Sequence, residues 1–100
     1  MITAIPPRIC LIEDDEIMGE SLCDRFTLEG FTIDWYRTAA AAAKSLHKAP
    51  YAVVISDIRL PDRDGGDLFL AEQQRRATLP PYLFINGFGA IDLADRKSVV

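Results

Sequence analysis

The chain has 100 residues, which is enough for one domain and too few for two separate hydrophobic cores. Hydrophobic residues make up 49% of it and charged residues 26%, a globular balance that excludes a disordered or fibrous chain. The formal net charge is -4 and the basic residues are scattered along the chain, so no basic stripe for nucleic acid is expected.

The N-terminus lacks the long apolar run of a signal peptide, and no stretch approaches the ~20 apolar residues of a membrane span. We therefore expect a cytoplasmic protein that does not contact a membrane. Cys10 and Cys23 match neither a CxxC motif nor a zinc-binding spacing. They are expected to be reduced thiols packed in or near the core.

Short apolar strands alternate with amphipathic helices along the chain. In chain order, strands are predicted over about 8–12, 31–36, 51–56 and 82–85, and helices over about 17–29, 38–48, 67–76 and 90–97. Gly30 stands where a helix C-cap glycine belongs, and Thr38 is a plausible N-cap of the second helix. The alternation implies parallel strands joined by right-handed crossovers, and so an α/β doubly wound sheet with helices on both faces.

Carboxylates follow two strands that are neighbours in such a sheet. Glu13 and Asp14 come directly after the first strand, and Asp57 stands at the end of the third. Ligands of doubly wound sheets bind beyond the carboxyl ends of the strands, so these side chains should meet there. Unpaired, they would repel one another, and a hard divalent cation such as Mg2+ resolves the repulsion. The main-chain carbonyl of Arg59 is a further candidate metal ligand.

Asp57 is the best candidate for a nucleophile, because it ends a buried strand and is followed by a turn-rich loop. A carboxylate of this kind can form an acyl phosphate, and phosphoryl transfer needs mainly positioning and charge neutralisation. A plainer interpretation remains open, since acidic runs are usually solvated surface. Asp62 and Asp64 are expected to shape the loop after Asp57 rather than to bind metal.

Two motifs resemble those of response-regulator receiver domains of two-component signal transduction. Residues 9–16 (ICLIEDDE) resemble the first-strand acidic motif, and residues 56–65 (SDIRLPDRDG) resemble the phosphorylation-site motif. The resemblance runs from about Arg8 to Asp95. It implies a flavodoxin-like receiver fold and Mg2+-dependent phosphorylation of Asp57 by a histidine kinase or a phosphotransfer protein. It also implies a conformational switch read by an output domain or a downstream protein.

The sequence departs from the family pattern at two positions. The family has Thr or Ser at the end of the fourth strand, where this chain has Asn86, whose amide is a larger, planar hydrogen-bond donor. The family lysine ends a fifth strand and would lie beyond Val100, and Lys97 does not stand in that context. We therefore expect residues 1–100 to form a receiver domain truncated before or within the fifth strand.

Truncation there would leave the strand at 82–85 as an open sheet edge. Open edges recruit other strands, so self-association through this edge is predicted. Residues 98–100 are an alternative start of the fifth strand, as in short-helix single-domain receivers. Residues 87–92 instead look most like receivers of regulators that activate alternative-sigma-factor promoters.

Three functions compete at this point. The first is a phosphoacceptor receiver that is not an enzyme in its own right. The second is a degenerate receiver used only as a protein-interaction module, which Asn86 and the missing lysine favour. The third is a hydrolase with an aspartyl-phosphate intermediate, which is disfavoured because Arg59 stands where such enzymes carry a second acid.

Overall fold

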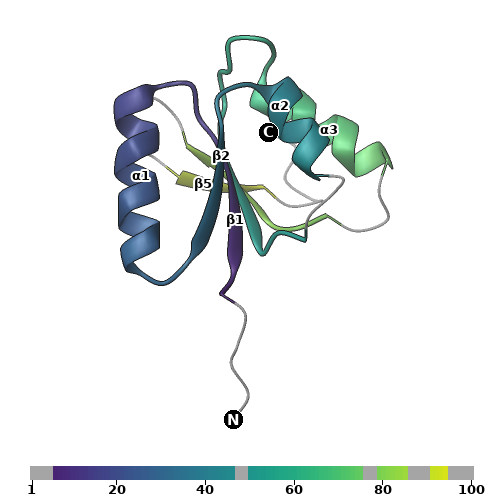
Figure 1. Ribbon diagram of the computed structural model, residues 1–100. Coiled ribbons are helices and arrows are strands. Elements are labelled where there is room, and N and C mark those ends of the chain that lie inside the picture. Colours follow the sequence, from purple (N-terminus) through teal and green to yellow (C-terminus); the bar gives the residue numbers. More distant parts are fainter. Residues whose placement is uncertain (1–5, 47–49, 76–78, 86–90, 95–100) are drawn as a thin grey trace.

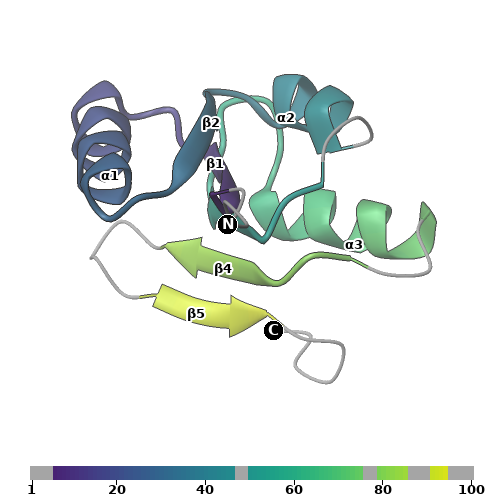
Figure 2. The ribbon, with the colours of Figure 1, turned by 60° about the horizontal axis from the view of Figure 1, so that its bottom comes forward.

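The computed structural model describes residues 6–46, 50–75, 79–85 and 91–94. Its strands are β1 (Arg8–Ile12), β2 (Thr32–Tyr36), β3 (Val53–Asp57), β4 (Tyr82–Ile85) and β5 (Ile91–Ala94), and its helices are α1 (Glu16–Leu28), α2 (Ala39–Leu46) and α3 (Gly65–Arg75). The sheet order is β2-β1-β3-β4-β5, with β1 to β4 parallel and β5 antiparallel to β4. One face carries α1 and the other carries α2 and α3 (Figures 1 and 2). The predicted doubly wound α/β sheet is confirmed.

The core lies on both faces of the sheet because β1 is buried on both sides. Ile9 and Leu11 belong to the cluster beneath α1, whereas Cys10 and Ile12 belong to the cluster beneath α2 and α3. All four side chains are buried, as expected of a central parallel strand. Cys10 is a free buried thiol, as the sequence predicts.

Helix α1 is fixed at both ends by the residues that flank it. Asp15 is its N-cap, with Oδ1 accepting a hydrogen bond from the Met18 amide at 3.0 Å. Gly30 follows the helix with φ of 93°, a left-handed conformation that side chains rarely adopt, which confirms its predicted C-cap role. No helix in the described ranges is long and apolar enough to cross a membrane.

The helix predicted over about 90–97 is wrong where the structure describes it. Residues 91–94 form β5, which pairs with β4 in the register Leu83↔Leu93 and Ile85↔Ile91. The period-two pattern Ile-Asp-Leu-Ala suits a strand, and the open backbone groups of β4 supply a partner that outweighs helix propensity.

The edge of β4 is therefore not exposed, which corrects the second prediction made for this region. β5 covers the edge through which self-association was expected, so that prediction loses its structural basis. Lys97 and residues 98–100 lie outside the described residues.

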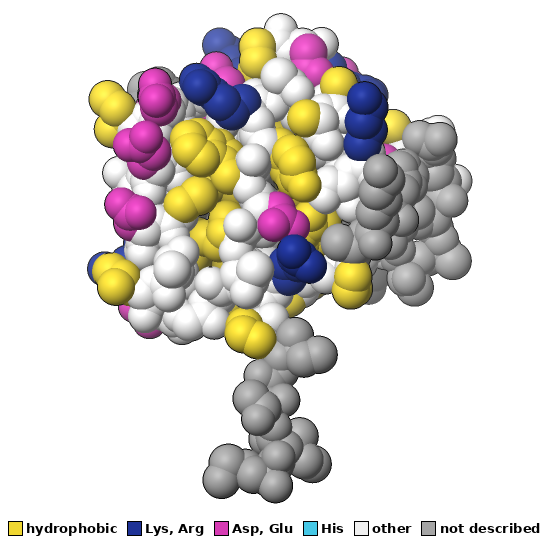
Figure 3. Space-filling model, in the orientation of Figure 1, with side chains coloured by type: hydrophobic (Ala, Val, Ile, Leu, Met, Phe, Trp, Pro, Cys, Tyr) yellow, Lys and Arg dark blue, Asp and Glu magenta, His cyan; other side chains and the backbone are white. Residues whose placement is uncertain are grey.

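Helix α1 packs directly against the aromatic ring of Trp35 in the edge strand β2. Gly19 is the buried residue of α1, and a Cβ atom there would overlap Cζ2 of Trp35. Hydrophobic side chains are visible between the acidic side chains of α1 and the middle of this face, where β2 lies (Figure 3). The absence of a side chain at Gly19 therefore sets how closely the helix approaches the sheet.

This contact predicts the effect of Gly19→Ala. The added methyl group must displace either the ring or the helix, and overpacking of this kind costs about 1–3 kcal/mol of stability. Ser21→Ala, at an exposed position of the same helix, is the control and should change stability little. Urea titrations that gave Gly19→Ala the stability of the parent would contradict the packing.

Candidate functional site

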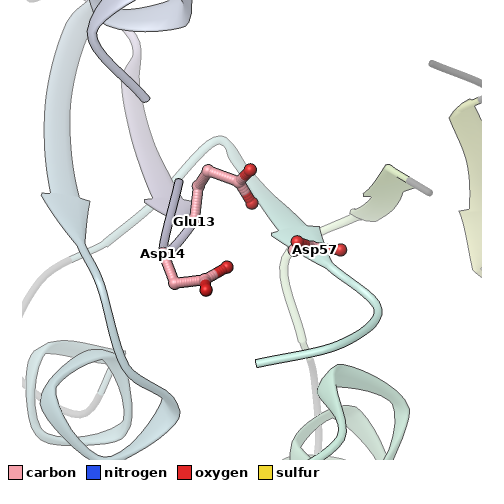
Figure 4. A group of neighbouring side chains, drawn as sticks. All are labelled: Glu13, Asp14 and Asp57. Carbon is pink, nitrogen blue, oxygen red and sulfur yellow. The ribbon is translucent and has the colours of Figure 1, made fainter. Parts of the chain in front are cut away.

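The acidic site lies at the carboxyl ends of two paired strands. β1 and β3 run parallel with Ile12 opposite Ser56, so Glu13 and Asp57, the residues that follow, come side by side. One carboxylate oxygen from each of Glu13, Asp14 and Asp57 lies within 4.8 Å of the others. The acidic side chains extend from the end of β1 toward Asp57 (Figure 4). The convergence predicted from the sequence is confirmed.

Glu13 is the most buried member of the site. Its side chain is 6% exposed, and its Oε2 has no hydrogen-bond partner among the described residues. Burial, above all, raises the pKa of Glu13 from 4.5 to about 8, and the nearby carboxylates of Asp57 and Asp14 add to this. Neither ion pair found in the described ranges involves this cluster.

These features fit a hard divalent cation. An orphaned, buried carboxylate oxygen beside two further carboxylates is an oxygen donor set of the kind that Mg2+ takes. Asp14 and Asp57 are more exposed than Glu13, so the site opens toward solvent on their side.

The loop after Asp57 turns back tightly on the end of β3. The Arg59 amide donates to Oδ1 of Asp57 at 3.3 Å, and the Gly65 amide donates to the Ile58 carbonyl at 2.7 Å. A Cβ atom at Gly65 would overlap the main-chain oxygen of Asp57, so the start of α3 can approach the strand only because this residue is glycine. The carbonyl of Arg59 as a metal ligand remains a proposal.

Asp62 ties this loop to the start of α2. Its two carboxylate oxygens accept hydrogen bonds from the amides of Ala39 and Ala40, each at 2.9 Å. These bonds hold the pKa of Asp62 below its usual value. The predicted loop-shaping role of Asp62 is consistent with this contact, but the contact to α2 itself was not foreseen. The sequence did offer a signal for this contact. The first turn of α2 contains no acidic residue of its own, so its amides can take a carboxylate from elsewhere in the chain.

Three further residues, two at the end of β2 and one directly after it, anchor the loop that carries Glu13 and Asp14, and this role was not predicted from the sequence. Trp35, Tyr36 and Arg37 all bind the main chain at Glu13 or Asp14. Asn86, the residue at the family Thr/Ser position, lies outside the described residues.

Comparisons with known proteins agree with this geometry. The family model of the response regulator receiver domain matches residues 9–97. The transcriptional regulatory protein QseB of Escherichia coli is 34% identical over 85% of this chain and 38% of its own length. The receiver protein CpdR of Brucella abortus is 34% identical over 86% of this chain and 71% of its own length. The solved HemR receiver domain of Leptospira biflexa has a TM-score of 0.73 at 35% identity, over 84% of this chain and 68% of that one.

The chain belongs to the response regulator receiver domain family, and its function is that of a receiver domain of two-component response regulators. It spans less than half the length of the first curated relatives. The subfamily resemblance drawn from residues 87–92 stays a prediction, since most of that stretch lies outside the described ranges.

The raised pKa of Glu13 predicts a pH dependence of stability in the metal-free protein. The folded protein keeps a proton on Glu13 up to about pH 8, whereas the unfolded chain releases it near pH 4.5. Between these values the folded state binds more protons, so the Glu13 contribution to the free energy of unfolding falls as pH rises. Glu13→Gln stays neutral, so urea titrations should show it gaining stability relative to the parent across this range.

Glu20→Gln, at an exposed position of α1, is the control and should keep the pH dependence of the parent. Added Mg2+ should stabilise the parent more at the upper end of the range than at the lower, because the cation replaces the proton. A stability difference between Glu13→Gln and the parent that did not change with pH would contradict the assignment.

Proposed function

We propose that Asp57 accepts a phosphoryl group from the phosphohistidine of a partner histidine kinase or phosphotransfer protein. The observation that carries the proposal is the meeting of Glu13, Asp14 and Asp57 within 4.8 Å at the ends of β1 and β3. We assign the nucleophile to Asp57 because it ends the buried strand β3 and is less buried than Glu13.

In the transfer, a carboxylate oxygen of Asp57 forms a bond to phosphorus while the phosphorus–nitrogen bond of the donor breaks. The released imidazole takes up a proton, and the product is an acyl phosphate on Asp57. In this proposal the chain acts as a phosphoacceptor rather than as an enzyme in its own right.

Glu13 and Asp14 hold the divalent cation together with Asp57 in this proposal, and the carbonyl of Arg59 is a further ligand. Mg2+ binding at an acidic pocket is typical of the family. When bound, the cation neutralises charge on the phosphoryl oxygens. Asn86 stands at the family Thr/Ser position, and its side-chain amide, which can donate hydrogen bonds, is our candidate for contact with the phosphoryl group.

We further propose that residues 1–100 act as one receiver domain whose phosphorylated form is read by an output domain or a downstream protein. Receiver domains as a class interact with histidine kinases and output domains. The β3–α3 loop is a suitable relay, because it joins Asp57 to α3 and, through Asp62, to α2.

Incubation with acetyl phosphate and Mg2+ tests the proposal. Intact-protein mass spectrometry should show the gain of one phosphoryl group in the parent, and chelation of Mg2+ or the change Asp57→Asn should abolish it. Asp67→Asn, an exposed aspartate in the first turn of α3, is the matched control and should be phosphorylated like the parent.

No phosphoryl gain in the folded parent would contradict phosphoacceptance and favour a receiver that serves only as an interaction module. A phosphoryl gain in Asp57→Asn equal to that of the parent would place the acceptor elsewhere.

A further inference from the structure

We infer that Trp35 is a positioning residue for the acidic site, an inference that rests on the function proposed above. Its indole N–H holds the main chain at Glu13 and so sets the direction in which the carboxylates of Glu13 and Asp14 face Asp57.

The main chain of Glu13 is bound at both of its polar groups by β2. Nε1 of Trp35 donates to the Glu13 carbonyl at 2.8 Å, and the Glu13 amide donates to the Tyr36 carbonyl at 2.9 Å. The next residue is held in the same way, because Nη2 of Arg37 donates to the Asp14 carbonyl at 2.8 Å. The last two residues of β2 and the residue after them therefore fix Glu13 and Asp14, two consecutive residues of the loop between β1 and α1.

The indole ring is itself held in place by α1. Because a Cβ atom at Gly19 would overlap the ring, the helix backbone lies against it and leaves it little room to turn. The helix begins at Glu16, directly after its N-cap Asp15, so the loop carrying Glu13 and Asp14 is short. Trp35 thus contacts both the buried side of α1, at Gly19, and the loop that precedes the same helix, at Glu13.

The site needs such an anchor because its members repel one another. Glu13 is almost fully buried beside Asp57, and a rotation of the loop main chain would carry its carboxylate away from Asp57 and so lower the repulsion between the two groups when both are ionised. The hydrogen bond from Trp35 opposes that rotation, and removing it would also leave the Glu13 carbonyl without this donor. In a protein without this hydrogen bond, cation binding would have to restore the loop geometry that the parent already has, and the affinity for the cation would fall.

The chain contains a single tryptophan, so replacing all tryptophan with benzothienylalanine changes this position alone. The analogue keeps the size and shape of the ring and replaces the N–H with sulfur. Calorimetry should show the Mg2+ dissociation constant rising about five-fold, the typical effect of one lost hydrogen bond. Phosphorylation by acetyl phosphate should slow at limiting Mg2+ and recover at saturating Mg2+, a split that a general loss of folding would not produce.

Tyr36→Phe is the matched control. It removes one side-chain hydrogen bond from the same strand, that from the Tyr36 hydroxyl to Ser45 Oγ at 2.6 Å, and leaves the main-chain bond to Glu13 intact. Its side chain packs with the cluster on the other face of the sheet, so the affinity for Mg2+ should stay that of the parent.

A second measurement needs no variant. The single indole N–H gives one resonance, and its exchange with solvent should slow when Mg2+ saturates the parent, because the cation stabilises the anchored loop. An indole N–H exchange rate that did not change with Mg2+ would overturn the role of Trp35. A folded benzothienylalanine protein with the Mg2+ affinity of the parent would do the same. A loss of affinity in Tyr36→Phe equal to that of the analogue would also overturn it. A parent that binds no Mg2+ would instead overturn the proposed function, and this inference with it.

Discussion

The parallel pairing of β1 with β3 is the constraint on which the site depends. It places Ile12 opposite Ser56, so the next residues of both strands emerge at one edge, and these residues carry carboxylates. Burial of Glu13 beside Asp57 favours its protonated form and raises its pKa. The fold thus holds together acidic groups that repel one another when they are ionised, and the divalent cation proposed above would relieve that repulsion.

The neighbouring segments make this arrangement rigid from three directions. On one side Trp35 binds the main chain at Glu13. On the other side Gly65 lets the start of α3 lie against the end of β3. From a third direction, Asp62 links the loop between β3 and α3 to the first turn of α2. Phosphorylation of Asp57 would add charge and bulk at the point where these segments meet, which is a physical basis for a switch.

The helices and strands that depend on local sequence pattern can be predicted from the sequence. An element whose conformation depends on pairing with a distant strand cannot. The bounds of β1 and β4 follow from apolar runs after proline pairs, and the carboxylate cluster follows from strand order. The strand β5 was missed because its conformation depends on the open edge of β4 and not on its own propensity. The bond from Trp35 to Glu13 joins residues 22 apart in the chain, and no local pattern encodes such a contact.

Glu13, Asp14 and Asp57 together are proposed to hold one divalent cation. Crystals soaked in Mn2+, which takes the same oxygen ligands as Mg2+ and scatters anomalously, test it most directly. We expect one anomalous peak within coordination distance of carboxylate oxygens of these residues. A fully soaked crystal with no peak among the three carboxylates, or with its only peak elsewhere on the molecule, would contradict it.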